Sequence, residues 1–305
     1  MLTEQQKQER LKVVTGSDAS TILGVNPYTS ILDLYMYKTG LKIEPDISHR
    51  PHVRAGSMLE EVVGQMFEQE TFKKIIKPTK MFVHSKYEWM AGNIDGLIEG
   101  ENAIIEIKTA SRSDGWGEQG ENVIPKHYLC QVAHYLAVTN AEMAYVAVLI
   151  GGWDFRWYRI QRSKALEQIL IEKEKAFWFD NVLAEIMPEP RNMDDVINKF
   201  RNDTLQEPVV ANSDISMAIS NLRAAKRMRD DLNDKIDKYT DEITVFMGAN
   251  DTLLDSNGNV AITWKAAKDS IHFDSQAFMK QYPKEYNAFL KVRPGSRRFL
   301  IKGEK

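Results

Sequence analysis

Asp95, Glu106 and Lys108, in the segment from position 93 to 108, have the types and spacing of a metal-dependent catalytic site. The segment has the pattern of two apolar strands joined by a tight Gly-Glu turn. Side chains two residues apart share one face of a strand, so Glu106 and Lys108 point one way, and Ile105 and Ile107 point the other. If the turn is symmetric, Asp95 lies directly opposite Glu106.

The chemistry of this arrangement follows from the repulsion between the two carboxylates. Opposed side chains in a sheet lie about 5 Å apart at Cβ, and like charges there destabilise the sheet unless a cation lies between them. Carboxylate oxygens suit Mg²⁺ or Mn²⁺, which keep several waters and bind substrate phosphate. Such an ion activates a water, and Lys108 can orient that water or offset charge on phosphorus. The pattern predicts phosphodiester hydrolysis, and a solvated edge hairpin with a Lys108–Glu106 pair is the alternative.

A predicted helix over residues 54–67 has an acidic residue at the edge of its apolar face. Leu59, Val62, Val63, Met66 and Phe67 recur at helical spacing and form that face. Glu60 lies at its edge, where it can be a third group of the metal site, although a plain surface glutamate is an equal alternative. We expect Glu61 to be solvated.

A second predicted helix begins at Pro125, since proline suits the first helical turn. His127, Gln131 and Tyr135 are four residues apart and share one face. Gln131 can hold a metal-bound water or a phosphate, and Tyr135 can bond a phosphate or stack on a base. The alternative places Tyr135 in the core with a satisfied hydroxyl. We expect His134 at the surface.

The composition is that of a soluble globular protein. The chain has 305 residues, of which 43% are apolar, enough for one large domain with an appendage or for two domains. It has no apolar run of membrane-spanning length and a polar N-terminus. The single cysteine, Cys130, excludes an internal disulfide, and we expect a cytoplasmic protein without a membrane partner. The net charge of −3 does not exclude a local phosphate-binding groove.

The pattern of the chain changes at residues 187–213, where three prolines punctuate a polar stretch. Before this stretch, short apolar strands alternate with amphipathic helices, which is an α/β pattern. After it, apolar residues recur at steps of three and four from Ile215 to Phe246, with Arg229 as the one polar position. This spacing predicts a long helix with coiled-coil or hairpin packing.

Two further elements are predicted near the C-terminus. Asn257-Gly258 lies between two apolar segments and is a strong signal for a β-hairpin. A last helix is expected to begin at Asp274 or Ser275 and to run toward Val292.

Four short motifs in a fixed order are more specific than any one of them. They are R-x-G-x-x-x-E from Arg54 to Glu60, G-x-x-D-G around Asp95, E-I-K-T from Glu106, and Q-x-x-x-Y from Gln131 to Tyr135. An R-x-x-x-x-T-x-S segment precedes them, from Arg10 to Ser17. Together they resemble the YqaJ-type viral recombinase family, the lambda exonuclease family of the PD-(D/E)xK nuclease superfamily. The resemblance extends to about Met187, although Ile94 replaces the proline of the superfamily's name.

The resemblance implies a fold and a set of site residues. The expected fold is a central mixed β-sheet flanked by helices, a restriction-endonuclease-like core, in residues 1–195. From the residue pattern described above, we expect residues 196–305 to form an appendage of a long helix, a β-hairpin and a helix. The implied metal-binding residues are Asp95, Glu106, Ile107 through its carbonyl, and Glu60. The implied catalytic residues are Lys108, Glu106, Asp95, Glu60 and Gln131. The implied DNA-binding residues are Arg10 and Ser17 at the 5′ phosphate, with Arg54 and Tyr135.

The implied activity is Mg²⁺-dependent degradation of one strand of linear duplex DNA, 5′ to 3′, with Mn²⁺ as a possible substitute. The product is a 3′ overhang for phage-type recombination by strand annealing. The resemblance further implies a homotrimer, a single-strand annealing partner, and a phage or prophage origin in a bacterial cytoplasm. Two alternatives stay open: an endonuclease or RecB-like nuclease of other polarity, and a DNA-binding or scaffold protein with a vestigial site.

Overall fold

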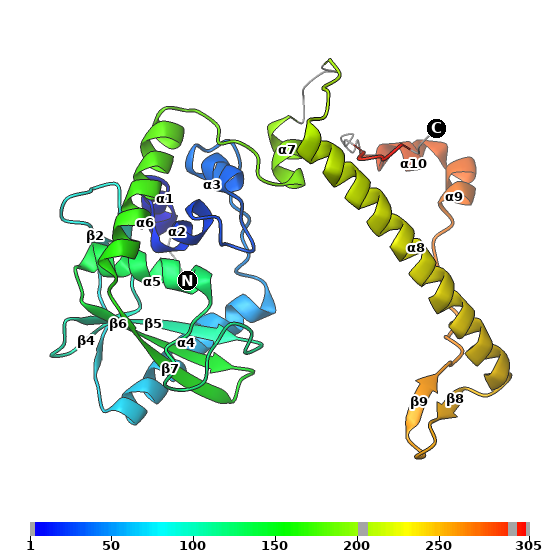
Figure 1. Ribbon diagram of the computed structural model, residues 1–305, viewed down its shortest axis with the longest axis horizontal. Helices are drawn as coiled ribbons and strands as arrows, with labels where there is room; N and C mark the ends of the chain where they lie inside the picture. The colour runs from blue at the N-terminus through cyan, green and yellow to red at the C-terminus, as the bar shows by residue number, and fades with distance from the viewer. Residues whose placement is uncertain (1–3, 201–206, 292–297, 303–305) are drawn as a thin grey trace. The chain divides into compact units, whose positions relative to one another are not determined.

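The computed structural model describes residues 4–200, 207–291 and 298–302, and it divides the chain into two units, Met1–Phe200 and Arg201–Lys305 (Figure 1). The boundary expected between residues 195 and 196 falls inside helix α7 (Met193–Lys199). Across the described ranges, none of the helices combines the length and the apolarity that crossing a bilayer requires.

The N-terminal unit is built from helices and two sheets. Its helices are α1 (Glu4–Leu11), α2 (Gly16–Ile22), α3 (Ile31–Lys38), α4 (Pro51–Thr71), α5 (Lys126–Thr139), α6 (Lys164–Ala176), the π-helix η1 (Phe177–Leu183) and α7. Its strands are β1 (Ile75–Ile76), β2 (Phe82–Val83), β3 (Ala91–Gly92), β4 (Gly96–Ile98), β5 (Ala103–Ala110), β6 (Met143–Ile150) and β7 (Asp154–Gln161).

The main sheet has the strand order β1-β4-β5-β6-β7 and is mixed. Strands β5 and β6 run parallel, and α5 connects them, as the crossover between parallel strands requires. The other neighbouring pairs are antiparallel. In the β4–β5 pair, Gly96 lies opposite Ile105 and Leu97 opposite Ile104, which is the register predicted from a symmetric turn. The predicted mixed sheet flanked by helices is therefore confirmed.

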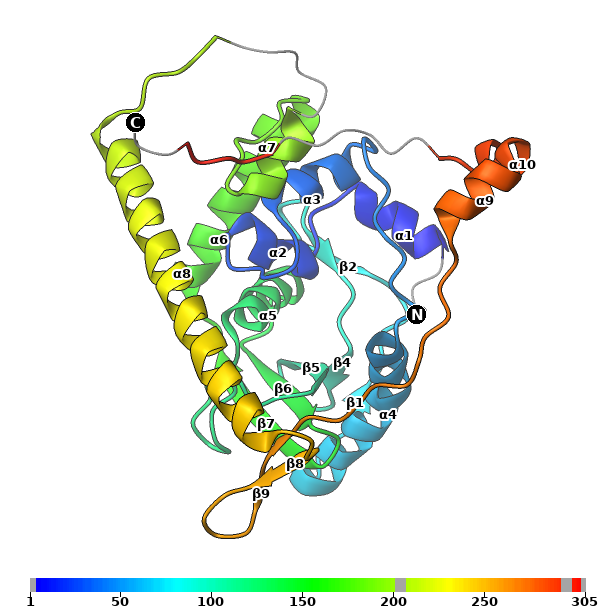
Figure 2. The ribbon, with the colours of Figure 1, turned by 90° about the vertical axis from the view of Figure 1, so that its right-hand side faces the viewer.

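The two faces of the sheet are covered by different helices (Figure 2). On one face, Ile104 of β5 packs in a cluster with Val132 and Leu136 of α5. On the other face, Ile105 and Ile107 pack with side chains of α4. Successive side chains of a strand point to opposite faces, so the alternation predicted for β5 is confirmed.

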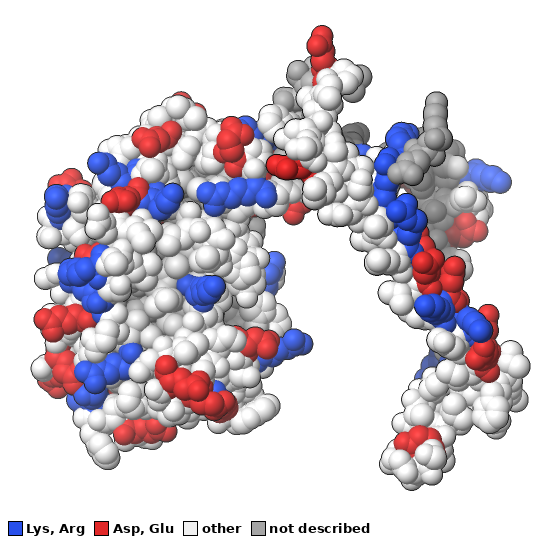
Figure 3. Space-filling view, viewed as in Figure 1, with Lys and Arg blue, Asp and Glu red and all other residues white. Residues whose placement is uncertain are grey.

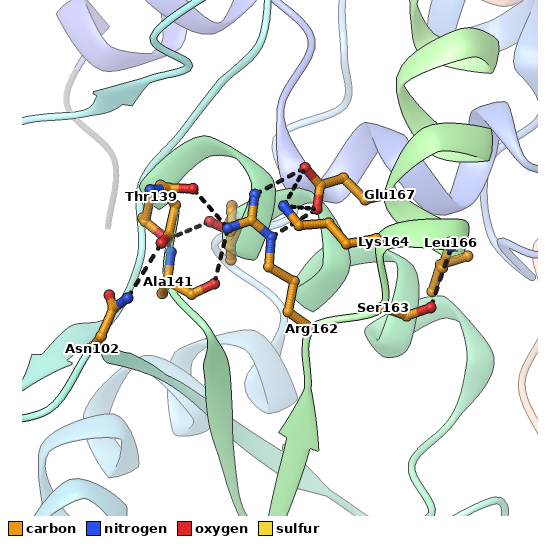
Figure 4. A network of polar contacts seen from close by, with 10 residues as sticks. Asn102, Thr139, Ala141, Arg162, Ser163, Lys164, Leu166 and Glu167 are labelled. Atoms are coloured by element: carbon orange, nitrogen blue, oxygen red, sulfur yellow. Dashed lines mark hydrogen bonds and ion pairs between the residues drawn. The ribbon is translucent and has the colours of Figure 1, made fainter.

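A polar network joins the end of α5 to the start of α6 (Figure 4). Arg162, the residue after β7, donates to both carboxylate oxygens of Glu167, at 2.7 and 2.8 Å. Its third nitrogen donates to the side chain of Asn140 at 2.8 Å. Asn140 ends α5 in the left-handed conformation, at φ 56°, which asparagine tolerates better than most residues. Bidentate pairs of this kind fix geometry, so the network anchors α5 against its neighbours.

The C-terminal unit contains the predicted long helix, α8 (Ser213–Met247), and the predicted hairpin, β8 (Thr252–Leu254) and β9 (Val260–Thr263). The predicted last helix is broken in two, α9 (Ser275–Gln281) and α10 (Pro283–Ala288). Asp274 caps α9, as expected. The helix does not run on toward Val292, because proline cannot continue a helix and starts a new one at position 283. Val292 itself lies outside the described residues.

Candidate active site

The candidate site is centred on the carboxylate of Glu106, which is 2% exposed. Its Oε1 accepts hydrogen bonds from the Lys108 ammonium and from Gln131 Nε2, the latter at 2.7 Å. Its Oε2 is buried and has no hydrogen-bond partner. A buried carboxylate oxygen without a donor costs free energy, so this atom is suited to bind a cation.

Asp95 is the residue before β4, and the β4–β5 register continues to place it opposite Glu106. Its Oδ2 accepts a hydrogen bond from the backbone N–H of Ile107 at 2.7 Å. Burial, and next the Glu106 carboxylate, raise the pKa of Asp95 to about 7. The Glu106 carboxylate thus disfavours ionisation of Asp95, which is the electrostatic signature predicted for a cation site.

The pKa values of Glu106 and Lys108 also depend on the neighbouring charged side chains. Burial raises the pKa of Glu106, and nearby Glu60 adds to that rise. Burial alone would lower the pKa of Lys108, but Glu106 and Asp95 raise it instead. Lys108 therefore stays an ammonium ion at neutral pH, held between carboxylates, with the ring of Tyr128 5.2 Å from its nitrogen.

Glu60 lies on α4, which covers the other face of the sheet, and it is near enough to Asp95 for the two carboxylates to interact electrostatically. It is half-buried, and burial and then Asp95 raise its pKa. Helix α4 approaches β5 closely, because a Cβ added to Gly64 would lie 3.3 Å from the Ile107 side chain. Glu61 is exposed, as predicted.

The predicted apolar face of this helix is narrower in the structure than in the sequence. Val63 and Phe67 are fully buried, but Val62 is 45% exposed. The prediction for Val62 was therefore wrong, because α4 covers the sheet with only a narrow strip of its surface. Arg54, on the first turn of α4, is exposed.

Helix α5 supplies Gln131 and Tyr135. Gln131 donates to Glu106 and, at 3.2 Å, to the Tyr135 hydroxyl. The Tyr135 ring is 6% exposed and lies against two glycines: a Cβ on Gly16 or Gly92 would be 2.4 or 2.6 Å from it. The core alternative for Tyr135 is therefore correct. Its ring is not available to stack on a base, and its hydroxyl supports Gln131.

His134 corrects a second expectation for the same helix. It is fully buried, not at the surface. One ring nitrogen lies 2.8 Å from a carboxylate oxygen of Glu174 in α6, and the other lies 3.0 Å from the Ala91 carbonyl of β3. Helices α2 and α6 cover the side of α5 that faces away from the sheet, which the spacing within one helix does not reveal.

Arg10 and Ser17 lie together in a polar pocket, separate from the Glu106 site, which is lined by residues of α1, α2 and α3. Arg10 Nη2 donates to Ser17 Oγ at 2.6 Å. The pocket has a volume of about 180 Å³, and Asp18 and Lys38 also line it. Burial would raise the pKa of Asp18, but Lys38 at 2.7 Å and then Arg10 lower it.

Sequence reasoning missed Asp18 and Lys38. Asp18 had a detectable signal, because Thr15 and Asp18 form a capping box at the start of α2. Lys38 had none, since only the fold brings the end of α3 to this pocket. Its ammonium also donates to two backbone carbonyls, those of Arg10 and Val13.

The donor set of the first site fits a hard divalent cation. Within the described residues, no group of three or more His, Cys, Asp and Glu side chains is arranged to hold one metal ion. Mg²⁺ does not require such a group, because it is usually held by one or two carboxylates and keeps several waters. Asp95 and Glu106, one of them with an oxygen that lacks a donor, meet this requirement.

Comparison with known proteins matches the chain to one family profile and to one relative in sequence. Residues 6–142 match the sequence profile of the YqaJ-like viral recombinase domain. The uncharacterized protein YqaJ of Bacillus subtilis is 38% identical over 182 residues, which are 59% of this chain and 56% of that protein. The chain thus spans little more than half the length of this relative.

Two solved structures are also similar. An alkaline exonuclease from Laribacter hongkongensis is 18% identical, with a TM-score of 0.47 over 60% of this chain and 94% of that one. A phage-related exonuclease from Haemophilus somnus is 13% identical, with a TM-score of 0.44 over 57% and 96% of the two chains.

Proposed function

We propose that this chain belongs to the YqaJ-like viral recombinase family, whose domain profile matches residues 6–142, and that it is a Mg²⁺-dependent exonuclease acting on linear duplex DNA. The observation that carries the proposal is the buried Glu106 carboxylate, which faces Asp95, is paired with Lys108, and has one oxygen without a donor. Nothing in an ordinary edge hairpin requires a buried carboxylate to lie beside a second, half-buried carboxylate and a half-buried lysine.

The residues of the site have separate roles in this proposal. Asp95, Glu106 and the Ile107 carbonyl hold the ion, and Mn²⁺ is an acceptable substitute for Mg²⁺. When bound, the ion polarises the phosphate and favours ionisation of a water. Lys108 keeps its proton, because two carboxylates stabilise the ammonium, and orients the attacking water or offsets charge on phosphorus.

In this proposal Gln131 and Glu60 assist the residues that hold the ion and orient the water. Gln131 fixes the Glu106 carboxylate through a 2.7 Å hydrogen bond and is itself in contact with the Tyr135 hydroxyl. Glu60 acts from α4 on the waters of the ion or on a second ion. Arg54, exposed on the same helix, contacts the DNA backbone.

The Arg10–Ser17 pocket binds the terminal 5′ phosphate and so gives the enzyme its direction, 5′ to 3′. The Lys38 ammonium is already engaged by Asp18 and two carbonyls, which leaves Arg10 as the cation that meets the phosphate. The product is a 3′ overhang for a single-strand annealing partner, and three copies form the assembly that encloses the duplex.

The test is a nuclease assay on three substrates, with Mg²⁺ and with EDTA. A linear duplex with 5′ phosphates should be digested at least about tenfold faster than its 5′-hydroxyl counterpart, because a charge-assisted contact to phosphate contributes at least about 1.5 kcal/mol. Covalently closed circles should stay intact, and EDTA should stop digestion. Digestion of circles as fast as of linear duplexes would instead favour the endonuclease. Release of a label from the 3′ end before one from the 5′ end would show that the enzyme degrades DNA in the 3′ to 5′ direction.

A further inference from the structure

Helix α8 carries a stripe of apolar residues, interrupted only by Arg229, that is exposed except at the half-buried Leu222 and Ile243. The stripe follows steps of three and four residues and comprises Ile215, Ala218, Leu222, Ala225, Arg229, Leu232, Ile236, Tyr239, Ile243 and Phe246. Within it, the side chains of Ile236 and Phe246 are 58% and 78% exposed. An apolar seam with this spacing normally packs against another helix.

The charges of α8 are segregated about the middle of this stripe. Residues 215–230 contain four basic residues and one acidic residue, a net charge of +3. Residues 231–246 contain two basic and five acidic residues, a net charge of −3. Figure 3 shows basic side chains on the earlier part of the helix and mostly acidic ones, with lysines among them, further along. Two such helices attract in the antiparallel direction and repel in the parallel one.

The sizes of the stripe residues show the same preference for the antiparallel direction. If two copies of α8 cross about the point between Asp230 and Asp231, paired residues have numbers that sum to 461, and each early stripe position meets a late one. Ala218 then faces Ile243, and Ala225 faces Ile236, so a small side chain opposes a large one.

A parallel arrangement of two α8 helices would pair the same stripe residues unfavourably. In-register parallel helices would set every stripe residue against its own copy. Alanine would then face alanine, and Phe246 would face Phe246. Arg229 would meet a second Arg229 in the seam, which places like charges together. In the antiparallel arrangement Arg229 lies beside Leu232 of the other copy instead, next to its acidic half.

We infer that α8 binds α8 of a second copy of this chain as an antiparallel coiled coil. The surface is self-complementary about its centre, as a two-fold symmetric interface requires. The 35 residues of the helix give a seam about 50 Å long. This pairing is independent of the nuclease site and of any assembly formed by the N-terminal unit.

The first test is the molar mass of the full chain by light scattering after size exclusion. Ile236→Asp places a charge in the seam and should halve the mass, whereas the control Ser220→Asp, on the opposite face of α8, should leave it unchanged. A mass unaffected by Ile236→Asp would overturn the inference, because the stripe would then pack within its own chain or against another partner. A threefold drop would point to a three-helix assembly and overturn it equally.

A second test reads the direction of the helices and does not depend on disruption. Ala225→Cys and Ile236→Cys chains, mixed and oxidised, should form a disulfide-linked pair, since both positions are exposed and face each other in this register. Each variant alone should not cross-link, because its two cysteines would be about 16 Å apart along the axis. Cross-linking of either variant alone would show parallel helices. The native Cys130 is buried, and the unmodified chain is the control.

Discussion

The two oxygens of the Glu106 carboxylate have unequal surroundings. One accepts from an ammonium and an amide, and the other is buried without a donor. A buried acceptor without a donor destabilises the fold, and Glu174, paired with His134, also has such an oxygen. Glu106 differs from Glu174 because a second carboxylate, Asp95, faces it beside Lys108, and this pair of carboxylates is what marks the free oxygen of Glu106 as a proposed cation ligand.

Replacement of Lys108 tests its proposed part in hydrolysis. Lys108→Ala should lower kcat at least about 100-fold, the usual loss when one electrostatic stabiliser of a transition state is removed, with DNA affinity largely unchanged. Single-turnover cleavage and a binding titration measure the two quantities. Lys73→Ala removes another lysine paired with a glutamate, Glu101, and is the matched control. Normal turnover in Lys108→Ala would remove the lysine from the mechanism.

The raised pKa of Asp95 makes the stability of the metal-free protein depend on pH. The folded protein holds a proton on Asp95 up to about pH 7, whereas an unperturbed carboxyl releases it near 3.8. The stabilisation of the folded state by proton binding at Asp95 is therefore fully present below pH 3.8 and is lost as the pH rises through 7. Asp95→Asn cannot ionise and should be more stable than the native chain in EDTA at pH 8, by roughly 1–3 kcal/mol.

Denaturant titrations of both proteins in EDTA, at pH 5 and pH 8, measure this difference. The gap should shrink at pH 5 and should reverse at pH 8 when Mg²⁺ is added, since only the native carboxylate binds the ion. The exposed Asp114→Asn is the control and should show neither effect. A gap that does not change between the two pH values would mean that Asp95 ionises normally.

At the scale of elements, β5 and α5 carry Glu106, Lys108 and Gln131, for which we propose catalytic roles, and close backbone contacts hold these elements in place. Strand β3 and helix α2 approach the Tyr135 ring through Gly92 and Gly16. Tyr135 in turn supports Gln131, which holds Glu106. The position of the Glu106 carboxylate thus depends on residues that never meet the substrate.

Gly92→Ala should disturb this arrangement. The added Cβ would lie 2.6 Å from the Tyr135 ring, so the ring must shift, with a loss of about 1–3 kcal/mol in the free energy of unfolding and reduced nuclease activity. Thermal unfolding and cleavage rates measure both. Adding Tyr135→Leu to Gly92→Ala should recover stability but not activity. Wild-type stability in the single variant would show that the sheet and helix are free to move apart.

The local pattern of the chain was sufficient to predict several elements, among them the β4–β5 pair, α4, α5, α8 and the β8–β9 hairpin, and some of their contacts. The alternation of Ile105, Glu106 and Ile107 predicted the two faces of β5, and the turn predicted its register with β4. The surroundings of α5 were not predictable in this way. His134 is buried because α6 and β3, far away in the sequence, cover it. Lys38 reaches the Arg10–Ser17 pocket for the same reason, through tertiary packing.

At the scale of the whole molecule, the two units carry two separate sets of features. The N-terminal unit holds the carboxylate–lysine site and the Arg10–Ser17 pocket. The C-terminal unit holds the α8 stripe and its divided charge. Chemistry and self-association are therefore proposed for different parts of the chain, and each can be removed by a substitution that leaves the other intact.

The most direct measurement of the central claim compares the native chain with Glu106→Gln on a linear 5′-phosphorylated duplex, in Mg²⁺ and in EDTA. Glutamine preserves the size of the side chain but removes the charge that a hard cation needs. We predict digestion by the native chain in Mg²⁺ only, and none above background by the variant. Digestion by the native chain in EDTA, or by Glu106→Gln at a rate near that of the native chain, would contradict the account.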